Sequence, residues 1–139
     1  AAGGFDESLP FSEDWDFWLR LTRVSQFLKL RESTTLYRQH SSQGSRITRP
    51  VDYRTRLLED ASRKWGLCSQ DGRCVSPKRF KRQLAGYCAG FGVGHLKGGE
   101  GASRVIAAKS FLKAWSIDRR YWRTLVYLAA MAIGWKPKW

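Results

Sequence analysis

Apolar and aromatic residues recur at spacings of three and four along most of this chain. That periodicity predicts five helices with buried faces. The first follows Ser12, which we expect to cap it, and the second is opened by Pro50 and closed by Gly66. The third starts at Ser76 and Pro77, a capping residue followed by a proline at the first helical position. The predicted faces are Trp15, Trp18, Leu19 and Thr22; Tyr53, Leu57, Leu58, Ala61 and Trp65; Phe80, Leu84, Tyr87, Cys88 and Phe91; Val105, Ala108, Phe111, Leu112 and Trp115; and the segment 121–135.

Between the first two helices the pattern changes from helical spacing to that of strands. Residues 27–31 alternate in the manner of a half-buried strand, and residues 34–38 are rich in β-branched and aromatic side chains. With the first helix they form an expected α/β unit over residues 1–48. A mainly α-helical region follows over residues 49–139.

Four glycines interrupt the third helix, at Gly86, Gly90, Gly92 and Gly94. Glycine weakens a helix interior because it loses more backbone entropy on folding than other residues do. This helix is therefore expected either to pack very closely on a neighbour or to fray.

The last expected helix carries Arg123 as its single charge, and residues 124–135 are uncharged. Such a segment is well short of the roughly 20 residues that cross a bilayer. Basic residues border it on both sides and tryptophans lie nearby, a combination that suits a membrane interface. A core helix of a small bundle fits the pattern equally well, because fully buried helices are apolar on all sides.

Charge is unevenly distributed over the 139 residues, which have a composition typical of a globular protein. Residues 1–40 hold five basic and six acidic side chains, a net charge of −1, so the total of +13 leaves +14 for residues 41–139. Such a field indicates an anionic partner: nucleic acid, a membrane surface or a phosphorylated substrate.

The three cysteines show no zinc-like pairing. Cys68 and Cys74 flank a turn and can bridge in an oxidising compartment, but reduced thiols are favoured because no secretory signal is visible. Cys88 is expected to be a small buried side chain. The sequence begins Ala-Ala-Gly-Gly without an initiating methionine, which resembles a cut inside a longer chain.

Acidic side chains cluster at the front of the chain, in Gly3-Gly4-Phe5-Asp6-Glu7 and again from Glu13 to Asp16. A Gly-Gly turn allows close approach of the backbone to a ligand. Acids at the mouth of a packed helix stand partly in a cleft and partly in solvent, as a general base requires. The alternative is that Glu13 and Asp14 are ordinary first-turn acids favoured by the helix dipole.

Arg38 and His40 form a second candidate site. Side chains alternate along a strand, so these two residues are expected to point the same way, next to the Ser-rich loop 41–46. A guanidinium beside an imidazole suits a diphosphate or a metal. A solvated strand end with an exposed histidine is the alternative.

Three ordered motifs give these residues a family resemblance. Gly-Gly-Phe-Asp-Glu, then Glu-Asp-Trp-Asp-Phe-Trp-Leu-Arg-Leu, then Leu-Tyr-Arg-Gln-His before the serine-rich loop resembles the C-terminal part of the catalytic domain of family 2 glycosyltransferases, which have a GT-A fold. The resemblance covers residues 3–46. The basic helical tail is similar to those that follow the catalytic domain in many bacterial members.

The resemblance implies that Asp14 is the general base that deprotonates an acceptor hydroxyl, and that Glu13 orients the site or contacts the acceptor. It implies further that substrate is bound by Gly3, Gly4, Asp6, Trp15 and Arg38. His40, with Arg38, would lie near the diphosphate of a nucleotide-sugar donor and its divalent metal, Mn or Mg. In such a transfer the metal neutralises the leaving diphosphate.

The family's nucleotide-binding half, with its Asp-x-Asp metal motif, would lie upstream of this sequence. The chain is therefore expected to be inactive by itself, as a fragment of an enzyme of surface-glycan or polysaccharide assembly with a glycan or lipid-linked acceptor. A cytoplasmic location is expected, with a peripheral position on the inner face of the plasma membrane as an option.

A binding module without catalysis is the alternative function. Basic side chains interleaved with aromatic ones are compatible with nucleic acid or with an anionic membrane surface. Nucleic acid is the less favoured partner, because the basic residues are spread over several helix faces and no nucleic-acid-binding motif appears.

Overall fold

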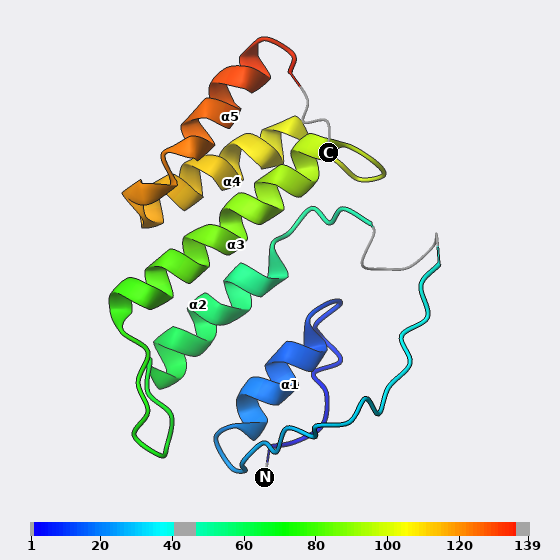
Figure 1. Ribbon diagram of the computed structural model, residues 1–139, viewed down its shortest axis with the longest axis vertical. Helices are drawn as coiled ribbons and strands as arrows, with labels where there is room; N and C mark the ends of the chain where they lie inside the picture. Colours follow the sequence, from blue (N-terminus) through cyan, green and yellow to red (C-terminus); the bar gives the residue numbers. More distant parts are fainter. Residues whose placement is uncertain (1, 41–46, 136–139) are drawn as a thin grey trace.

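Helices make up the fold, and each lies where the periodicity of the sequence predicts one. The computed structural model describes residues 2–40 and 47–135, and within them the chain forms five α-helices and one 3₁₀ turn. These are α1 (Glu13–Leu21), α2 (Tyr53–Trp65), α3 (Pro77–Lys97), α4 (Arg104–Ile117), the 3₁₀ turn η2 (Arg119–Tyr121) and α5 (Arg123–Ala132). Figure 1 shows α2, α3, α4 and α5 side by side in chain order, with consecutive helices running in opposite directions and α1 beyond α2.

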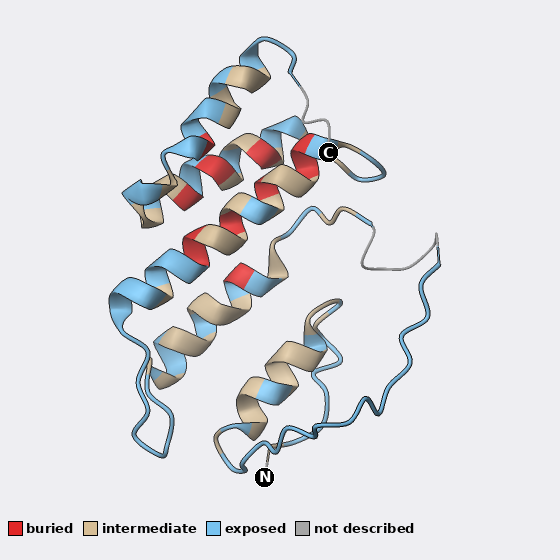
Figure 2. Ribbon diagram, in the orientation of Figure 1, coloured by how far each residue is buried: buried red, intermediate tan, exposed pale blue. Residues whose placement is uncertain are grey.

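The core lies between α3 and α4, which make the most extensive contact in the fold. Phe111 of α4 is fully buried beside Leu96 and Ala107, and Tyr127 and Leu128 of α5 pack against them. Figure 2 shows the buried residues concentrated along α3 and α4. Every residue of α1, in contrast, keeps some exposure to solvent.

Two of the helix glycines explain how closely α3 approaches its neighbours. A Cβ atom built on Gly92 would lie 2.7 Å from the Phe111 ring and 3.2 Å from the carbonyl oxygen of Ala107. At Gly86 it would lie 2.8 Å from the hydroxyl of Tyr121. Of the two expectations for this helix, close packing is therefore confirmed, because α3 continues without interruption to Lys97.

Side-chain caps set the starts of the three central helices. Ser76 accepts a hydrogen bond from the Arg79 amide at the start of α3, with Pro77 in the first helical position, as predicted. Ser103 accepts from the Ile106 amide and caps α4. The second helix starts at Tyr53 rather than at Pro50, because Asp52 supplies its cap.

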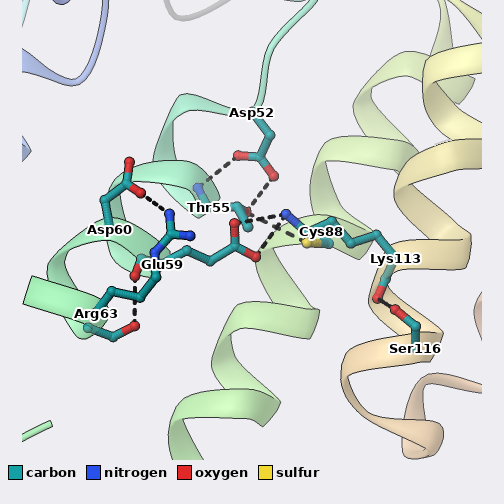
Figure 3. Close-up of polar contacts among 9 residues, drawn as sticks. Asp52, Thr55, Glu59, Asp60, Arg63, Cys88, Lys113 and Ser116 are labelled. Carbon is teal, nitrogen blue, oxygen red and sulfur yellow. Dashed lines mark hydrogen bonds and ion pairs between the residues drawn. The ribbon is translucent and has the colours of Figure 1, made fainter. Parts of the chain in front are cut away.

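Polar contacts join α2 to α3 and α4 (Figure 3). Lys113 of α4 forms an ion pair with Glu59 of α2 at 2.8 Å. Asp52 accepts hydrogen bonds from the amide and hydroxyl of Thr55, and the thiol of Cys88 in α3 donates to the same hydroxyl oxygen over 3.7 Å. Burial raises the pKa of the Cys88 thiol, so the thiol stays protonated and acts as donor.

The predicted strands 27–31 and 34–38 are absent, and the α/β fold class is wrong. In the part of the chain that the structure describes, the only β-type pairing is an isolated bridge between Cys68 and Cys74. All residues from 24 to 40 are exposed, with Leu28 at 87% and Leu36 at 100% of full exposure. Alternation produces a strand only where a neighbouring strand supplies hydrogen bonds and a second layer covers the apolar face, and the described residues supply neither.

Cys68 and Cys74 are joined in a disulfide, although reduced thiols were favoured by the sequence. Their Cα atoms lie 4.1 Å apart, on the two sides of the turn between α2 and α3. Gly72 occupies that turn with φ of 80°, in agreement with the predicted Asp-Gly turn. Cys88 is free and buried, as expected.

The last helix packs as a bundle helix on one of its faces only. Thr124 is buried, and Tyr127, Leu128 and Met131 pack on the core, as in a bundle helix. The opposite face of α5 is exposed. Within residues 2–40 and 47–135, no helix has the length and apolar character needed to cross a membrane.

Candidate functional site

A wide groove runs between the start of α1, the segment that leads into α2, and one face of α3. Its volume is about 1050 Å³. Its lining residues are Phe11, Ser12, Glu13, Asp14, Trp15, Tyr37, Ile47, Thr48, Arg49, Val51, Asp52, Tyr53, Arg54, Gly86, Tyr87, Gly90, Phe91, Gly94, Lys97 and Gly98. Both candidate catalytic acids therefore border one hollow of the surface.

The first turn of α1 places these acids. Glu13 and Asp14 are its first two residues, and the Asp14 carboxylate accepts a hydrogen bond from the Trp15 amide at 2.8 Å. Ser12 precedes them with φ of 65°, in the left-handed region. Among the described residues its side chain caps no helix amide, so the predicted Ser12 cap is wrong, although the predicted helix start is correct.

Aromatic rings fix α1 against the rest of the groove. Phe11 contacts the Tyr53 ring edge-on at 5.6 Å between centroids, and Trp15 contacts Tyr87 in the same way at 6.4 Å. The guanidinium of Arg54 lies over both Trp15 and Tyr87, at 4.8 and 5.1 Å from their centroids. The groove wall is therefore aromatic, with a basic group held between two of its rings.

Positive charge accompanies the acids in the groove. The Arg49 guanidinium lies 3.2 Å from the centroid of Phe11, and Lys97 comes from the last turn of α3. A groove with both signs of charge and aromatic walls can hold a neutral polar ligand such as a sugar, or an anionic one.

Gly3 and Gly4 lie away from the groove, against the other end of α1. Arg20 donates hydrogen bonds to the carbonyl oxygens of Ala2 and Gly4, the latter at 2.7 Å, while its Nε pairs with Asp16 at 2.8 Å. A Cβ on Gly3, where φ is 70°, would touch the guanidinium at 3.4 Å. Glycine at position 3 therefore has a structural reason, its positive φ beside Arg20, whereas at Gly4 a Cβ would meet nothing within 4 Å.

Asp6 is also outside the groove and is engaged locally. Its carboxylate accepts hydrogen bonds from the hydroxyl and amide of Ser8, at 2.6 and 2.9 Å. The Ser8 hydroxyl bond, followed by the amide bond, lowers the pKa of Asp6 below its ordinary value. In this conformation Asp6 closes a turn at the surface and does not meet Asp14 in the groove.

The structure does not bring Arg38 and His40 into the groove. Both lie in the exposed segment that follows α1, and Tyr37 is the neighbour that lines the groove. The serine-rich loop 41–46, predicted to stand beside them, lies outside the described residues. In the described ranges no group of three or more His, Cys, Asp or Glu side chains is placed to hold a metal ion.

Several groove residues were missed by sequence reasoning, chiefly Arg49, Arg54, Tyr87 and Lys97. One signal existed: Gly86, Gly90 and Gly94 recur every fourth residue and therefore lie on one face of α3, and Gly98 follows directly after the helix. At Gly90 and Gly94 a Cβ would meet nothing within 4 Å, because these positions form the open floor of the groove.

A second, apolar hollow of about 510 Å³ lies along α1. It is lined by Trp15, Trp18, Leu19, Thr22 and Phe27. Trp18 and Phe27 remain 49% and 58% exposed there, so the predicted face of α1 is only partly covered.

Comparison with protein-family models, with characterised proteins and with solved structures found no match to this chain. The function must therefore be argued from the groove and from the motifs that border it. Glu13, Asp14 and Trp15 of the Glu-Asp-Trp-Asp motif lie together on the rim of the groove.

Proposed function

We propose that the groove lined by Glu13 and Asp14 receives the acceptor of an inverting glycosyltransferase. The reaction would move a sugar from a nucleotide-diphosphate donor to an acceptor hydroxyl, in surface-glycan or polysaccharide assembly. One observation carries the proposal. The two acids of the Glu-Asp motif begin α1 side by side and open into a groove of about 1050 Å³, instead of projecting from a convex surface as ordinary first-turn acids do.

Asp14 is the general base in this proposal. In an inverting transfer the acceptor oxygen forms its bond to the anomeric carbon while the bond to the diphosphate breaks, and a carboxylate removes the hydroxyl proton. The hydrogen bond from the Trp15 amide fixes one carboxylate oxygen of Asp14. Glu13, the neighbouring acid, would contact the acceptor sugar.

The aromatic wall supports a sugar ligand. Trp15, Tyr53 and Tyr87 line the same groove as the acids, and amphipathic rings of this kind offer both apolar area and polar edges. A few polar groups placed in a mainly aromatic pocket are typical of small-molecule sites. Trp15 is therefore the residue we assign to acceptor stacking.

The binding site for the nucleotide-sugar donor is not assigned to the groove. Gly3, Gly4, Asp6, Arg38 and His40 do not line it, and the described residues offer no ligand group that fits a divalent metal. No step of the proposed transfer is therefore routed through a metal on these residues. Nucleotide-sugar binding is assigned to the upstream half that the family resemblance implies.

We place the transfer in the cytoplasm, at the inner face of the plasma membrane, as part of the same proposal. The structure joins Cys68 and Cys74 in a disulfide, a bond that is rare in that compartment. Their pair lies in the turn before α3, outside the groove, so its redox state does not alter the proposed site.

The test is Asp14→Asn in a protein that carries this chain together with a nucleotide-sugar-binding half. Loss of the base should lower the transfer rate by about 10²–10⁴-fold, the usual contribution of general base catalysis, while nucleotide binding stays the same. Initial-rate kinetics with labelled donor and calorimetric titration of the nucleotide give the two measurements.

Asp60→Asn is the matched control, because Asp60 is an exposed acid of α2 that pairs with Arg63 outside the groove. Its transfer rate should equal that of the unaltered protein. Transfer that persists at full rate in Asp14→Asn would remove Asp14 as the base.

A further inference from the structure

Helix α5 forms one edge of the row of helices and has two different faces (Figures 1 and 2). Its inner face packs on α4 through Tyr127, Leu128 and Met131, and Thr124 is buried. Its outer face is made of apolar side chains at spacings of one, three and four residues, which keep them on one side of a helix. We call these residues the outer stripe: Trp122, Leu125, Val126, Ala129 and Ile133.

The outer stripe is exposed along its length. Trp122 keeps 57%, Val126 53% and Ile133 83% of full exposure, and Leu125 keeps 37%. No charged residue interrupts the sequence from 124 to 135. A continuous apolar surface of this kind on a water-facing helix is a mark of an interaction site, because exposed apolar area is unfavourable in water.

Basic side chains border both ends of the stripe. Arg119 and Arg120 are exposed in η2, directly before α5, and Arg123 stands in its first turn. At the other end Arg104 of α4 reaches across to the carbonyl oxygen of Met131 and remains exposed. The surface therefore combines an apolar centre with a positively charged border.

We propose that the outer stripe and its arginines dock on an anionic lipid bilayer surface, with α5 lying in the plane of the interface. An apolar helix face flanked by Arg and Lys is the pattern of interfacial helices. The ten residues of α5 extend about 15 Å at 1.5 Å per residue, which suits insertion along one face. The stem of the exposed Arg120 can run along the apolar surface while its guanidinium group reaches lipid phosphates, and Arg119, stacked over Trp115, adds positive charge beside it.

Other occupants fit the same surface less well. Nucleic acid would contact the arginines but would leave the apolar stripe in water. A second copy of the chain would cover the stripe, but each copy carries a net charge of +13 and would bring a second set of arginines to the contact. An anionic bilayer matches both the apolar centre and the basic border.

The experiment uses the 139-residue chain and two kinds of vesicle, phosphatidylcholine alone and an equal mixture of phosphatidylcholine and phosphatidylglycerol. Co-sedimentation should show binding to the mixed vesicles, weakened by added salt, and little binding to the neutral ones. The double variant Leu125→Gln/Val126→Gln should lower the affinity by about tenfold or more. Arg119→Gln/Arg120→Gln should lower it by about tenfold to thirtyfold on the anionic vesicles.

Matched controls separate the stripe from general charge and general hydrophobicity. Lys78→Gln/Arg79→Gln removes the same charge from the exposed first turn of α3, and Leu36→Gln removes a fully exposed leucine remote in sequence from α5. Both controls should change vesicle binding far less than the α5 variants. Far-ultraviolet circular dichroism should show the same helix content in every variant, and Ile133→Gln, beyond the end of α5, provides a second stripe variant if the double one unfolds.

Three results would overturn the proposal. The first is failure to bind the mixed vesicles, including the case in which the chain binds duplex DNA instead or self-associates through the stripe. The second is vesicle binding that the α5 variants leave unchanged. The third is that Lys78→Gln/Arg79→Gln in α3 weakens vesicle binding as much as the α5 variants do. That result would indicate diffuse attraction of the bilayer by net charge. None of the variants touches Glu13 or Asp14, so transfer activity is tested independently.

Discussion

His95 is the buried side chain that joins the segment before α2 to the start of α4. It is 2% exposed, its Nε2 lies 2.8 Å from the carbonyl oxygen of Arg49, and its Nδ1 accepts a hydrogen bond from the Ser103 amide at 3.0 Å. Because Nδ1 is an acceptor, Nε2 carries the proton and donates to Arg49. One neutral imidazole thus holds two chain segments that are distant in sequence.

Replacing His95 with alanine should lower the free energy of unfolding by about 2–4 kcal/mol, through two lost hydrogen bonds and a cavity. Urea unfolding followed by circular dichroism measures the change. Lys97→Ala, an exposed side chain in the same turn of α3, should stay within about 0.5 kcal/mol of the unaltered chain. If both variants behave alike, the two His95 contacts contribute nothing measurable.

The contribution of the Asp6 carboxylate to stability is expected to depend on pH. Its pKa lies below the ordinary 3.8 because of the Ser8 hydrogen bonds, so its favourable contribution is present above that value and disappears as pH falls through the lowered pKa. Ser8→Ala removes the hydroxyl bond and should move the pKa of Asp6 upward, toward 3.8. A carboxyl NMR titration measures this shift. An unchanged titration curve would show that the turn is not formed in solution.

Glu13, Asp14 and Trp15 line the groove together because they share the first turn of one helix, a relation that helical spacing already specifies. Gly3 and Gly4 were assigned to a ligand because glycine permits close approach. The group that approaches them is Arg20, eighteen residues after Ala2, and no local pattern in the sequence announces that contact.

At the scale of elements, α3 contains a matched pair of glycines. Gly92→Ala should destabilise the fold by about 1–3 kcal/mol, because its Cβ would overlap the Phe111 ring and press on the α4 backbone. Gly94→Ala should stabilise it by about 0.5–1 kcal/mol, because that Cβ meets open space and alanine favours the helix. Thermal unfolding of the two variants measures both. Equal effects, in either direction, would mean that α3 and α4 are not packed as closely as described.

Among the helices after residue 50, α3 follows most directly from the sequence, because the Ser76 cap, Pro77 and the apolar spacing agree there. Helix α5 has no side-chain cap and follows from its apolar spacing alone. The strands 27–31 and 34–38 do not form, although the first alternates and the second is rich in β-branched and aromatic side chains. A strand needs a partner elsewhere in the chain, and β propensity largely expresses packing against such a partner. The local sequence pattern could therefore suggest these strands, but it contains no information on whether a partner strand exists.

At the scale of the whole molecule, the groove is a product of topology. Glu13 and Asp14 come from α1, while Arg54 comes from α2 and Tyr87 from α3, more than thirty residues farther along. The order of the helices in space brings them together, and periodicity within one helix carries no information about that order. The acidic rim was therefore predictable, whereas the opposite, aromatic and basic wall was not.

The same architecture predicts unequal local stability. The α3–α4 pair contains most of the buried residues, whereas α1 has none and is held through partly exposed rings and the stacking of Arg54 between Trp15 and Tyr87. Regions with few buried apolar contacts open more readily than the core. Amides of α1 should therefore exchange with deuterium at least about tenfold faster than those of α3, since a tenfold difference needs only about 1.4 kcal/mol.

Arg54→Ala should accelerate exchange in α1 further, because it removes the cation held between the two rings, and should leave α3 and α4 unchanged. Arg56→Ala, an exposed arginine of the same helix, is the control and should alter neither region. Mass spectrometry of peptides from α1 and α3 resolves the two rates. Identical protection in both helices would show that α1 opens only when the core unfolds, and the groove would then be a rigid site. Faster exchange in α1 would make the groove adjustable, with Glu13 and Asp14 on its movable side.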